Sequence, residues 1–324
     1  MSRVPSGLDA GDEEIGGVGG MRRMVIGVDV GGTKTRLRLA GLAGGEVAVD
    51  RTVPSAGWQT RSLPGAAAWL AERVAALPRP GDEVARVVAG AHGCETPEQC
   101  AGLERELRAL LGLPVTVVND AELLVPAAGL PAGIGLVAGT GSVAVGRHRE
   151  TGRHMSAGGW GWVLGDDGSG SALVREAARA VLARADDGAP FEPLGLALLR
   201  SYGVPGLPEL AAAMSWDGGV ETWAEHTPAV FAAAEEGSPL ALDVIRRGGA
   251  ALAGLVVSLA LRGAEVSAVV AAGGVIVAQP ALLAAFEEEL AARLPGVPTT
   301  LLRTPPVAGA VELARRPTAE PDPE

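Results

Sequence analysis

Cysteine and aromatic side chains are scarce in this chain of 324 residues, and each shortage narrows the classes of protein it could be. The two cysteines, Cys94 and Cys100, provide neither a disulfide framework nor a four-thiolate metal site. Cys100 shares a helical face with leucines further along, so we expect a core thiol in a reducing cytoplasm. Because aromatic residues make up only 3%, alanine, valine and leucine must form the cores.

Basic residues are also in deficit, with 27 lysines and arginines against 38 aspartates and glutamates. The net charge of −11 argues against a nucleic-acid partner, because binding phosphates requires a basic surface. Residues 1–20 lack the apolar segment of a signal peptide, and the apolar run 250–261 is too short to span a bilayer. We predict a cytoplasmic protein that does not bind a membrane, with disordered ends at 1–23 and 316–324.

The most informative stretch is residues 24–40, MVIGVDVGGTKTRLRLA, which we expect to form two strands joined by a Gly31-Gly32 turn. Asp29 interrupts the apolar first strand, where a carboxylate is costly unless it is paired or binds a metal. The glycines, two threonines and Lys34 offer a polyphosphate backbone amides, hydroxyls and an ammonium, and Asp29 would hold the accompanying divalent cation. An ordinary hairpin with a solvated aspartate is the alternative.

The same pattern recurs at residues 134–147, again around a turn of glycine, threonine and serine. This second copy predicts two related half-molecules that approach one nucleotide from opposite sides. Only the first copy carries the acid, because Val137 stands opposite Asp29. A P-loop and a dinucleotide-binding fingerprint are both excluded, since each requires a helix after its glycines and a strand follows here.

A short apolar strand at residues 115–118 ends in Asn119-Asp120, just before the second half begins. Ligand crevices of open α/β sheets lie at the carboxyl ends of strands, so Asp120 is well placed to meet a ligand. The alternative is that Asn119 or Asp120 caps the helix expected over residues 121–128. Capping does not exclude a catalytic role.

Residues 158–170, GGWGWVLGDDGSG, form the least generic segment of the chain. Trp160 and Trp162 have flat faces that could stack on a sugar ring, and Asp166 could accept hydrogen bonds from hydroxyl groups. The helix expected over residues 171–184 would point the positive end of its dipole at the same place. A structural turn with tryptophan as core filler is the alternative.

The last elements close the predicted fold. A strand at residues 266–271 runs into Gly273-Gly274, which could lie flat against a nucleoside, and a helix at 307–315 is expected to pack on the first half. Alternating strands and helices indicate an α/β protein whose sheets are covered on both faces. The predicted domains are residues 24–120, with 306–315 packing back on them, and residues 121–305.

The chain resembles the actin-like ATPase and sugar kinase superfamily in five segments, which occur in the family's order: VIGVDVGGTKT, VVNDAE, AGTGSVA, GGWGWVLGDDGSG and VVAAGGV. Within it, the glycine-rich loop is similar to that of the N-acetylglucosamine kinase and BadF/BadG/BcrA/BcrD-type ATPase group. The resemblance spans residues 24–315. It implies two actin-like (ribonuclease H-like) domains with a hinge and a central cleft for ATP, Mg²⁺ and a sugar, in a homodimer.

By the same resemblance, Asp120 is the general base and Asp29 serves Mg²⁺, and both roles agree with the reading of the residues themselves. The other implied contacts divide by ligand. Those for ATP are Gly31, Gly32, Thr33, Lys34, Gly139, Thr140, Gly141, Ser142, Gly273 and Gly274. Those for the sugar are Asn119, Asp120, Gly159, Trp160 and Asp166.

One departure from the family bears on the substrate. Kinases of that group tend to carry an asparagine after the third strand, close to the N-acetyl group, and residues 54–58 contain none. We predict an ATP-dependent kinase of amino sugars, with N-acetylglucosamine as the first candidate. The alternatives are a BadF-type ATPase that activates a partner through an iron–sulfur cluster, a sugar-sensing regulator and a sugar-binding module without ATP hydrolysis. Two cysteines do not suit a cluster, and the intact Asp29 and Asp120 favour turnover.

Overall fold

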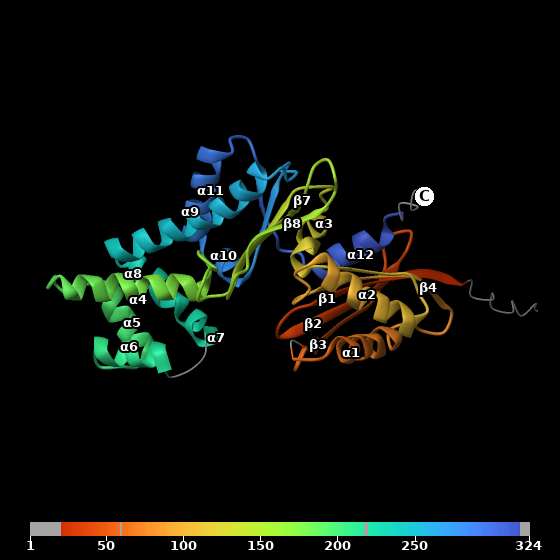
Figure 1. Cartoon of the computed structure of the whole chain (residues 1–324), viewed down its shortest axis with the longest axis horizontal. Helices are drawn as coiled ribbons and strands as arrows, with labels where there is room; N and C mark the ends of the chain where they lie inside the picture. The colour runs from red at the N-terminus through yellow and green to blue at the C-terminus, as the bar shows by residue number, and fades with distance from the viewer. Residues whose placement is uncertain (1–20, 59, 217–219, 318–324) are drawn as a thin grey trace, which may run out of the picture.

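The computed structural model describes residues 21–58, 60–216 and 220–317. They form two lobes, each built on a five-stranded sheet, with the chain crossing between the lobes near α3 and again before α12 (Figure 1). The ends predicted to be disordered fall mostly outside these ranges. The first strand nevertheless begins at Arg22, earlier than predicted, because the Arg22 guanidinium pairs with the buried Asp82 carboxylate at 2.7 Å.

The sheet of the first lobe has the order β3-β2-β1-β4-β5, with β1 antiparallel to β2 and parallel to β4. Strand β1 is apolar on both faces because both faces are covered. Ile26 and Val28 pack under α1 and α2, whereas Val25 packs against Val311 of α12. The last helix therefore packs on the sheet of the first lobe. The elements are β1 (Arg22–Val30), β2 (Lys34–Gly41), β3 (Val47–Pro54), α1 (Leu63–Ala75), β4 (Asp82–Ala91), α2 (Pro97–Leu111), β5 (Val115–Val118) and α12 (Val307–Arg315).

The second lobe repeats this topology, since its sheet has the order β10-β9-β6-β7-β8. Reversed, that order matches β3-β2-β1-β4-β5 strand for strand, which confirms the two related half-molecules. Two of its strands, β8 and β10, were not predicted. The strands are β6 (Ile134–Ala138), β7 (Ser142–Arg147), β8 (His154–Gly158), β9 (Val269–Ala272) and β10 (Thr299–Leu301).

Helices cover the second sheet and add a helical extension at the end far from the first lobe (Figure 1). Ser169 caps the first of them, its hydroxyl accepting from the amide of Ala172. The helices are α4 (Gly170–Asp186), α5 (Pro193–Tyr202), α6 (Leu207–Trp216), α7 (Val220–Trp223), η2 (Ala224–His226), α8 (Thr227–Glu235), α9 (Pro239–Leu261), α10 (Gly274–Ala278) and α11 (Pro280–Arg293).

Helix α9 is, within the described ranges, the only helix that by length and composition could cross a membrane. It is longer than the apolar run 250–261 on which the prediction rested. Half of its apolar window is buried, however, and Leu252, Val256 and Leu259 belong to the core of the second lobe. This burial is typical of the core helix of a globular fold.

A short segment joins the lobes, formed by the 3₁₀ helix η1 (Asp120–Leu123) and α3 (Leu124–Ala127). Asn119 caps η1 through its side chain, and Glu122 completes a capping box by accepting from the Asn119 amide. Leu123 lies in the core beside α12, while Leu124 packs on β9 of the second lobe. The junction is therefore anchored in both lobes, with Asp120 at its start.

Candidate functional site

The hairpin between β1 and β2 carries the carboxylate that the sequence singled out. Asp29 lies opposite Arg36 of β2 and Gly90 of β4, and the Gly31 amide donates to the Lys34 carbonyl at 3.0 Å to close the turn. Burial and the nearby Asp120 carboxylate raise the pKa of Asp29 to about 7, against the opposing charges of Lys34 and Arg36. A carboxylate destabilised in this way gains most from a bound cation.

The side chains around Asp29 suit a Mg²⁺ ion that water and phosphate also coordinate better than a cation coordinated by protein side chains alone. Among the residues that the structure describes, no group of three or more histidine, cysteine, aspartate or glutamate side chains is placed to hold a metal. Protein Mg²⁺ sites commonly use one or two carboxylates, with water and substrate phosphates filling the remaining positions. Asp29 in an open cavity fits that pattern.

A cavity of about 390 Å³ brings Asp29 and Lys34 of the first lobe together with Gly273 and Gly274 of the second. These four residues were predicted from segments far apart in the chain. Arg303, which the sequence analysis missed, also lines the cavity, as does Arg36. Three cationic side chains around one carboxylate suit a polyphosphate with its divalent cation. A larger cavity of about 510 Å³ lies between α4 and α9 and contains none of the predicted site residues.

Gly273 has a backbone conformation that only glycine adopts easily, with φ of 108°. A Cβ atom there would lie 2.4 Å from the Ala138 carbonyl oxygen at the end of β6. The Gly273-Gly274 turn therefore lies directly against the start of the second hairpin. A Cβ at Gly139 would likewise lie 3.7 Å from the Gly274 amide nitrogen.

The turn of the second glycine-rich hairpin, residues 139–142, is closely bound to the loop that follows β8. The Gly170 amide donates to the Gly139 carbonyl at 2.8 Å, and the Gly159 amide to the Ser142 carbonyl at 2.9 Å. Ser142 is buried, and its hydroxyl donates to the Asp167 carbonyl at 3.0 Å. The Ser142 hydroxyl is thus already engaged within the lobe, whereas Thr140 is exposed.

The two tryptophans of the loop have different environments. Trp160 is 75% exposed, whereas the Trp162 ring meets Trp223 edge-on with centroids 4.8 Å apart. Trp160 is therefore the more accessible ring, Trp162 is partly buried beside Trp223, and stacking of either ring on a sugar stays a prediction. Arg175 of α4 holds the loop by donating to the carbonyls of Trp162 and Gly165.

Asp120 lies directly after β5, at the carboxyl end of the sheet. Its Oδ1 accepts from the Ala121 amide at 3.0 Å, and its Oδ2 lies 3.8 Å from Nδ1 of His92. Burial raises the pKa of Asp120, the nearby Glu95 adds to the rise, and His92 opposes it. A carboxyl group with a raised pKa is the stronger proton acceptor when ionised.

His92 was missed in the sequence, where no histidine shows metal-ligand spacing. The available signal was its position directly after β4, the strand next to β5. Its amide donates to the Val30 carbonyl at 2.9 Å, and its own carbonyl accepts from Trp58 Nε1 at 2.8 Å. The loop that differs from the family at 54–58 therefore supports His92 through Trp58.

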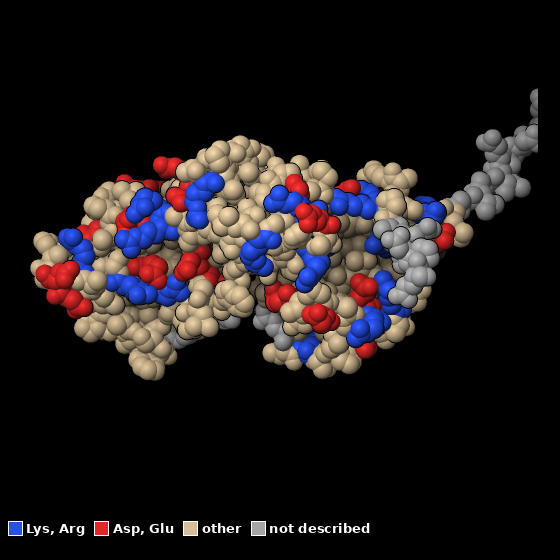
Figure 2. Space-filling model, turned by 45° about the horizontal axis from the view of Figure 1, so that its top comes forward, with Lys and Arg blue, Asp and Glu red and all other residues tan. Residues whose placement is uncertain are grey.

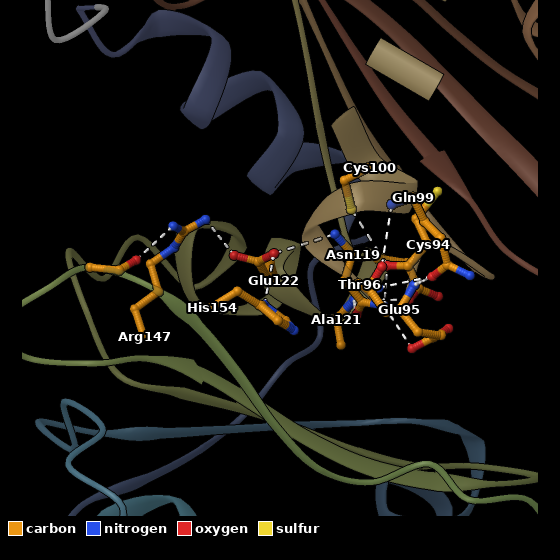
Figure 3. A network of polar contacts seen from close by, with 12 residues as sticks. Cys94, Glu95, Thr96, Gln99, Cys100, Asn119, Ala121, Glu122, Arg147 and His154 are labelled. Carbon is orange, nitrogen blue, oxygen red and sulfur yellow. Dashed lines mark hydrogen bonds and ion pairs between the residues drawn. The ribbon is translucent and has the colours of Figure 1, made fainter. Parts of the chain in front are cut away.

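Asn119 is 4% exposed and lies in a network of polar contacts (Figure 3). Its Nδ2 donates to the Cys94 carbonyl at 3.2 Å and to Glu95 Oε2 at 3.1 Å, while its Oδ1 accepts from the Ala121 amide at 3.0 Å. Capping, left open by the sequence, is confirmed for Asn119. Its contact with a sugar stays a prediction, because these partners already occupy its polar atoms.

Glu122 connects the two lobes next to Asn119. It pairs with Arg147 of β7 at 2.5 Å and with Nδ1 of His154 of β8 at 3.1 Å (Figure 3). Burial alone would raise the pKa of Glu122, but His154 and Arg147 lower it below its usual value. Cys94 and Cys100 line a cavity of about 440 Å³ beside these residues, and the Cys100 thiol donates to the Cys94 carbonyl at 3.5 Å.

Comparison with known proteins agrees with this geometry. No curated protein matches the chain. Among solved structures, it is similar to a candidate N-acetylglucosamine kinase from Chromobacterium violaceum, with 23% identity, 91% of this chain and 100% of that chain covered, and a TM-score of 0.67. A candidate N-acetylglucosamine kinase from Porphyromonas gingivalis has 19% identity, coverages of 90% and 99%, and a TM-score of 0.60.

A ROK family glucokinase from Streptomyces griseus, solved with glucose and AMPPNP, has 22% identity, coverages of 90% and 98%, and a TM-score of 0.56. At these identities the likeness establishes the fold. The profile of the BadF/BadG/BcrA/BcrD ATPase family matches residues 26–314, almost the whole of the described chain. The protein belongs to the BadF/BadG/BcrA/BcrD ATPase family and has the fold of the actin-like sugar kinases.

Proposed function

We propose that the protein transfers the γ-phosphoryl group of ATP to a hydroxyl group of an amino sugar, with N-acetylglucosamine as the first candidate. One observation carries this proposal. Asp29 and Asp120 lie near each other at one end of the first sheet, and the pKa of each carboxyl group is raised. One of them faces a cavity shared with Gly273 and Gly274 of the other lobe. Phosphoryl transfer requires such a pair, since one carboxylate holds the cation and the other accepts the hydroxyl proton.

Each residue has a defined task in this reaction. Asp29 would hold Mg²⁺, which neutralises the charge of the β- and γ-phosphates when bound. Lys34 and the amides of the two hairpins would position the phosphates. Asp120 would take the proton from the attacking hydroxyl group, held in orientation by the Ala121 amide on its other oxygen. Closure of the lobes would exclude water that otherwise competes for the phosphoryl group.

The exposed ring of Trp160 supports a pyranose as the acceptor, because a flat apolar face stacks on a sugar ring. The loop at 54–58 supports only a modest preference for an N-acetyl group. Its Trp58 is buried on His92, and the Ser55 hydroxyl is bonded to that of Thr35 at 2.7 Å. One missing hydrogen bond costs about 0.5–1.5 kcal/mol net, which weakens a preference roughly 2- to 13-fold without reversing it.

An ADP-release assay over a panel of hexoses and amino sugars tests this proposal. We expect sugar-dependent ADP release with N-acetylglucosamine, and glucosamine or glucose within about two orders of magnitude in kcat/KM, from the cost of one or two hydrogen bonds. A value for N-acetylglucosamine roughly a thousand-fold or more below that of another sugar would contradict the substrate assignment. ADP release at the same rate with and without each sugar would contradict the kinase assignment itself.

A homodimer in the cytoplasm without nucleic-acid or membrane partners completes the proposal. The charge distribution supports the absence of a nucleic-acid partner, because lysine and arginine are interspersed with aspartate and glutamate on the face shown in Figure 2. Membership of this ATPase family also fits a second function, that of an ATPase that activates a partner enzyme. The two functions differ in the fate of the phosphoryl group, which goes to a sugar in one and to water in the other.

A further inference from the structure

We propose that Asp166 is a positioning residue that fastens the sugar-side loop, residues 158–168, to the turn of the second glycine-rich hairpin, residues 139–142. The carboxylate would thereby make nucleotide binding sensitive to the sugar. This role differs from a direct contact between Asp166 and the sugar hydroxyl groups. It rests on the proposed function for the identity of the two ligands, a sugar and a nucleotide. The contact between the loop and the hairpin does not itself depend on any ligand.

The contacts of the Asp166 carboxylate carry the proposal. The backbone amides of Ser142, in the hairpin, and of Gly161, in its own loop, favour the ionised form of this carboxylate and oppose the rise in pKa that burial causes. Its Oδ2 lies so close to the hairpin that a Cβ atom at Gly141 would be 2.9 Å away. One side chain therefore links two segments that are predicted to bind different ligands. A hydrogen bond to an ionised group is stronger than one between neutral groups.

The backbone at Asp166 is unusual as well. With φ of 58°, it is the only non-glycine residue in the left-handed region among those that the structure describes. Aspartate tolerates this conformation better than most residues, but it is still disfavoured and persists where surrounding contacts fix it. The Ser169 amide donates to the Asp166 carbonyl at 3.0 Å, which holds the turn next to the start of α4.

The loop has two other kinds of contact, with Ser142 of the hairpin through the Gly159 amide and the Asp167 carbonyl, and with α4 through Arg175. Arg175 binds the Trp162 and Gly165 carbonyls and pairs with the Asp167 carboxylate at 2.8 Å. Trp160 packs over this part, since a Cβ at Gly165 would lie 3.1 Å from the Trp160 Cβ. A sugar that stacks on Trp160 therefore orders a loop whose carboxylate holds a hairpin amide.

A shared rigid unit predicts coupling between the two ligands. If the sugar orders residues 158–168, the hairpin amides are ordered with them, and a nucleotide that binds afterwards loses less conformational entropy. The coupling must be reciprocal, so the nucleotide tightens sugar binding by the same factor. Removing the Asp166 carboxylate should reduce this factor, while the hydrogen bonds of Ser142 with Gly159 and Asp167 remain.

Hydrogen exchange of the unliganded protein tests the fastening without any assumption about function. Asp166→Gly keeps the left-handed backbone and removes the carboxylate, so exchange should rise roughly tenfold or more at the Ser142 and Gly161 amides together. Asp166→Asn, which retains one acceptor oxygen, should lie between wild type and glycine. Asp167→Asn is the matched control, because that carboxylate pairs with Arg175, and it should leave exchange at 139–142 unchanged.

Two outcomes of this exchange experiment would overturn the fastening. One is faster exchange confined to residues 158–168 in Asp166→Gly, which would show that the carboxylate orders only its own loop. The other is an equal effect of Asp167→Asn on residues 139–142. Should the glycine variant fail to fold, the asparagine variant supplies the same comparison with a smaller expected change.

The affinity of a non-hydrolysable ATP analogue, with and without saturating N-acetylglucosamine, tests the coupling. Wild type should bind the analogue several-fold more tightly with the sugar, and in Asp166→Gly the ratio should fall towards one, while Asp167→Asn keeps the wild-type ratio. A wild-type ratio in Asp166→Gly would overturn the coupling. If wild type binds no sugar at all, the proposed function fails, and the exchange experiment still decides the fastening.

Discussion

Replacement of Asp120 with asparagine is expected to lower kcat by roughly 10²–10⁴ while sugar affinity stays within a few-fold. The amide keeps the size of the side chain and one acceptor oxygen for the Ala121 amide, so the shape of the site is preserved. What it loses is the capacity to accept a proton from the sugar hydroxyl group. Steady-state kinetics and direct titration of the sugar separate the two effects.

The pH profile of wild type reports on both carboxylates, because Asp29 must also be ionised to hold the cation and its pKa is raised to about 7. The base must be ionised, and burial raises the pKa of Asp120, so activity should fall on the acid side at a higher pH than an ordinary aspartate would give. Asp187→Asn, an exposed carboxylate after α4, is the control and should behave as wild type. An Asp120→Asn protein with more than half of wild-type turnover and an unchanged fold would rule out the general base.

Replacement of Asp29 with asparagine is expected to stabilise the unliganded protein above pH 7 by about 1–3 kcal/mol and to remove much of its response to Mg²⁺. The folded protein holds a proton on Asp29 up to a pKa of about 7, whereas the unfolded chain releases it near 3.8. Between these values the folded state binds more protons than the unfolded state. Wild-type stability should therefore fall as pH rises from about 4 to 7, and this decrease should be smaller in Asp29→Asn.

Denaturant unfolding at a series of pH values measures this difference, and repetition with Mg²⁺ and an ATP analogue measures the ligand effect. Wild type should gain stability from Mg²⁺ with the analogue, since ligands that bind the folded state stabilise it, and the variant should gain much less. Asp187→Asn is the control here too, because that carboxylate is exposed after α4 and lies outside the cavity. Identical Mg²⁺ dependence in wild type and Asp29→Asn would contradict the assignment of the two hairpins.

The sequence predicted the fold well where apolar runs and glycine turns were long and distinct. The β1–β2 hairpin, its second copy and the returning helix α12 all lie where they were expected. Strands β8 and β10 were missed because His154–Gly158 mixes polar and small residues and Thr299–Leu301 has only three residues. Periodicity cannot identify a strand this short, and the neighbouring strand of the sheet supplies the pairing that forms it.

The candidate site was predictable where it depends on local patterns. Asp29, Lys34, Gly273 and Gly274 stood out as a carboxylate, a lysine and glycines in unusual places, and the structure brings them to one cavity. The sequence places His92 just after a strand, but its relation to Asp120 depends on two strands lying side by side. The free ring of Trp160 and the packed ring of Trp162 could not be distinguished either, since Trp223 is distant in sequence.

The fate of the phosphoryl group tests the central claim most directly. ³¹P NMR of the wild-type protein with ATP, Mg²⁺ and N-acetylglucosamine follows ADP, inorganic phosphate and a sugar phosphomonoester in one sample. The account predicts that the sugar phosphomonoester forms in step with ADP, with little inorganic phosphate, and that Asp120→Asn suppresses both. ADP accompanied by an equal amount of inorganic phosphate, with no phosphorylated sugar from N-acetylglucosamine, glucosamine or glucose, would contradict the kinase and favour an ATPase that serves a partner enzyme.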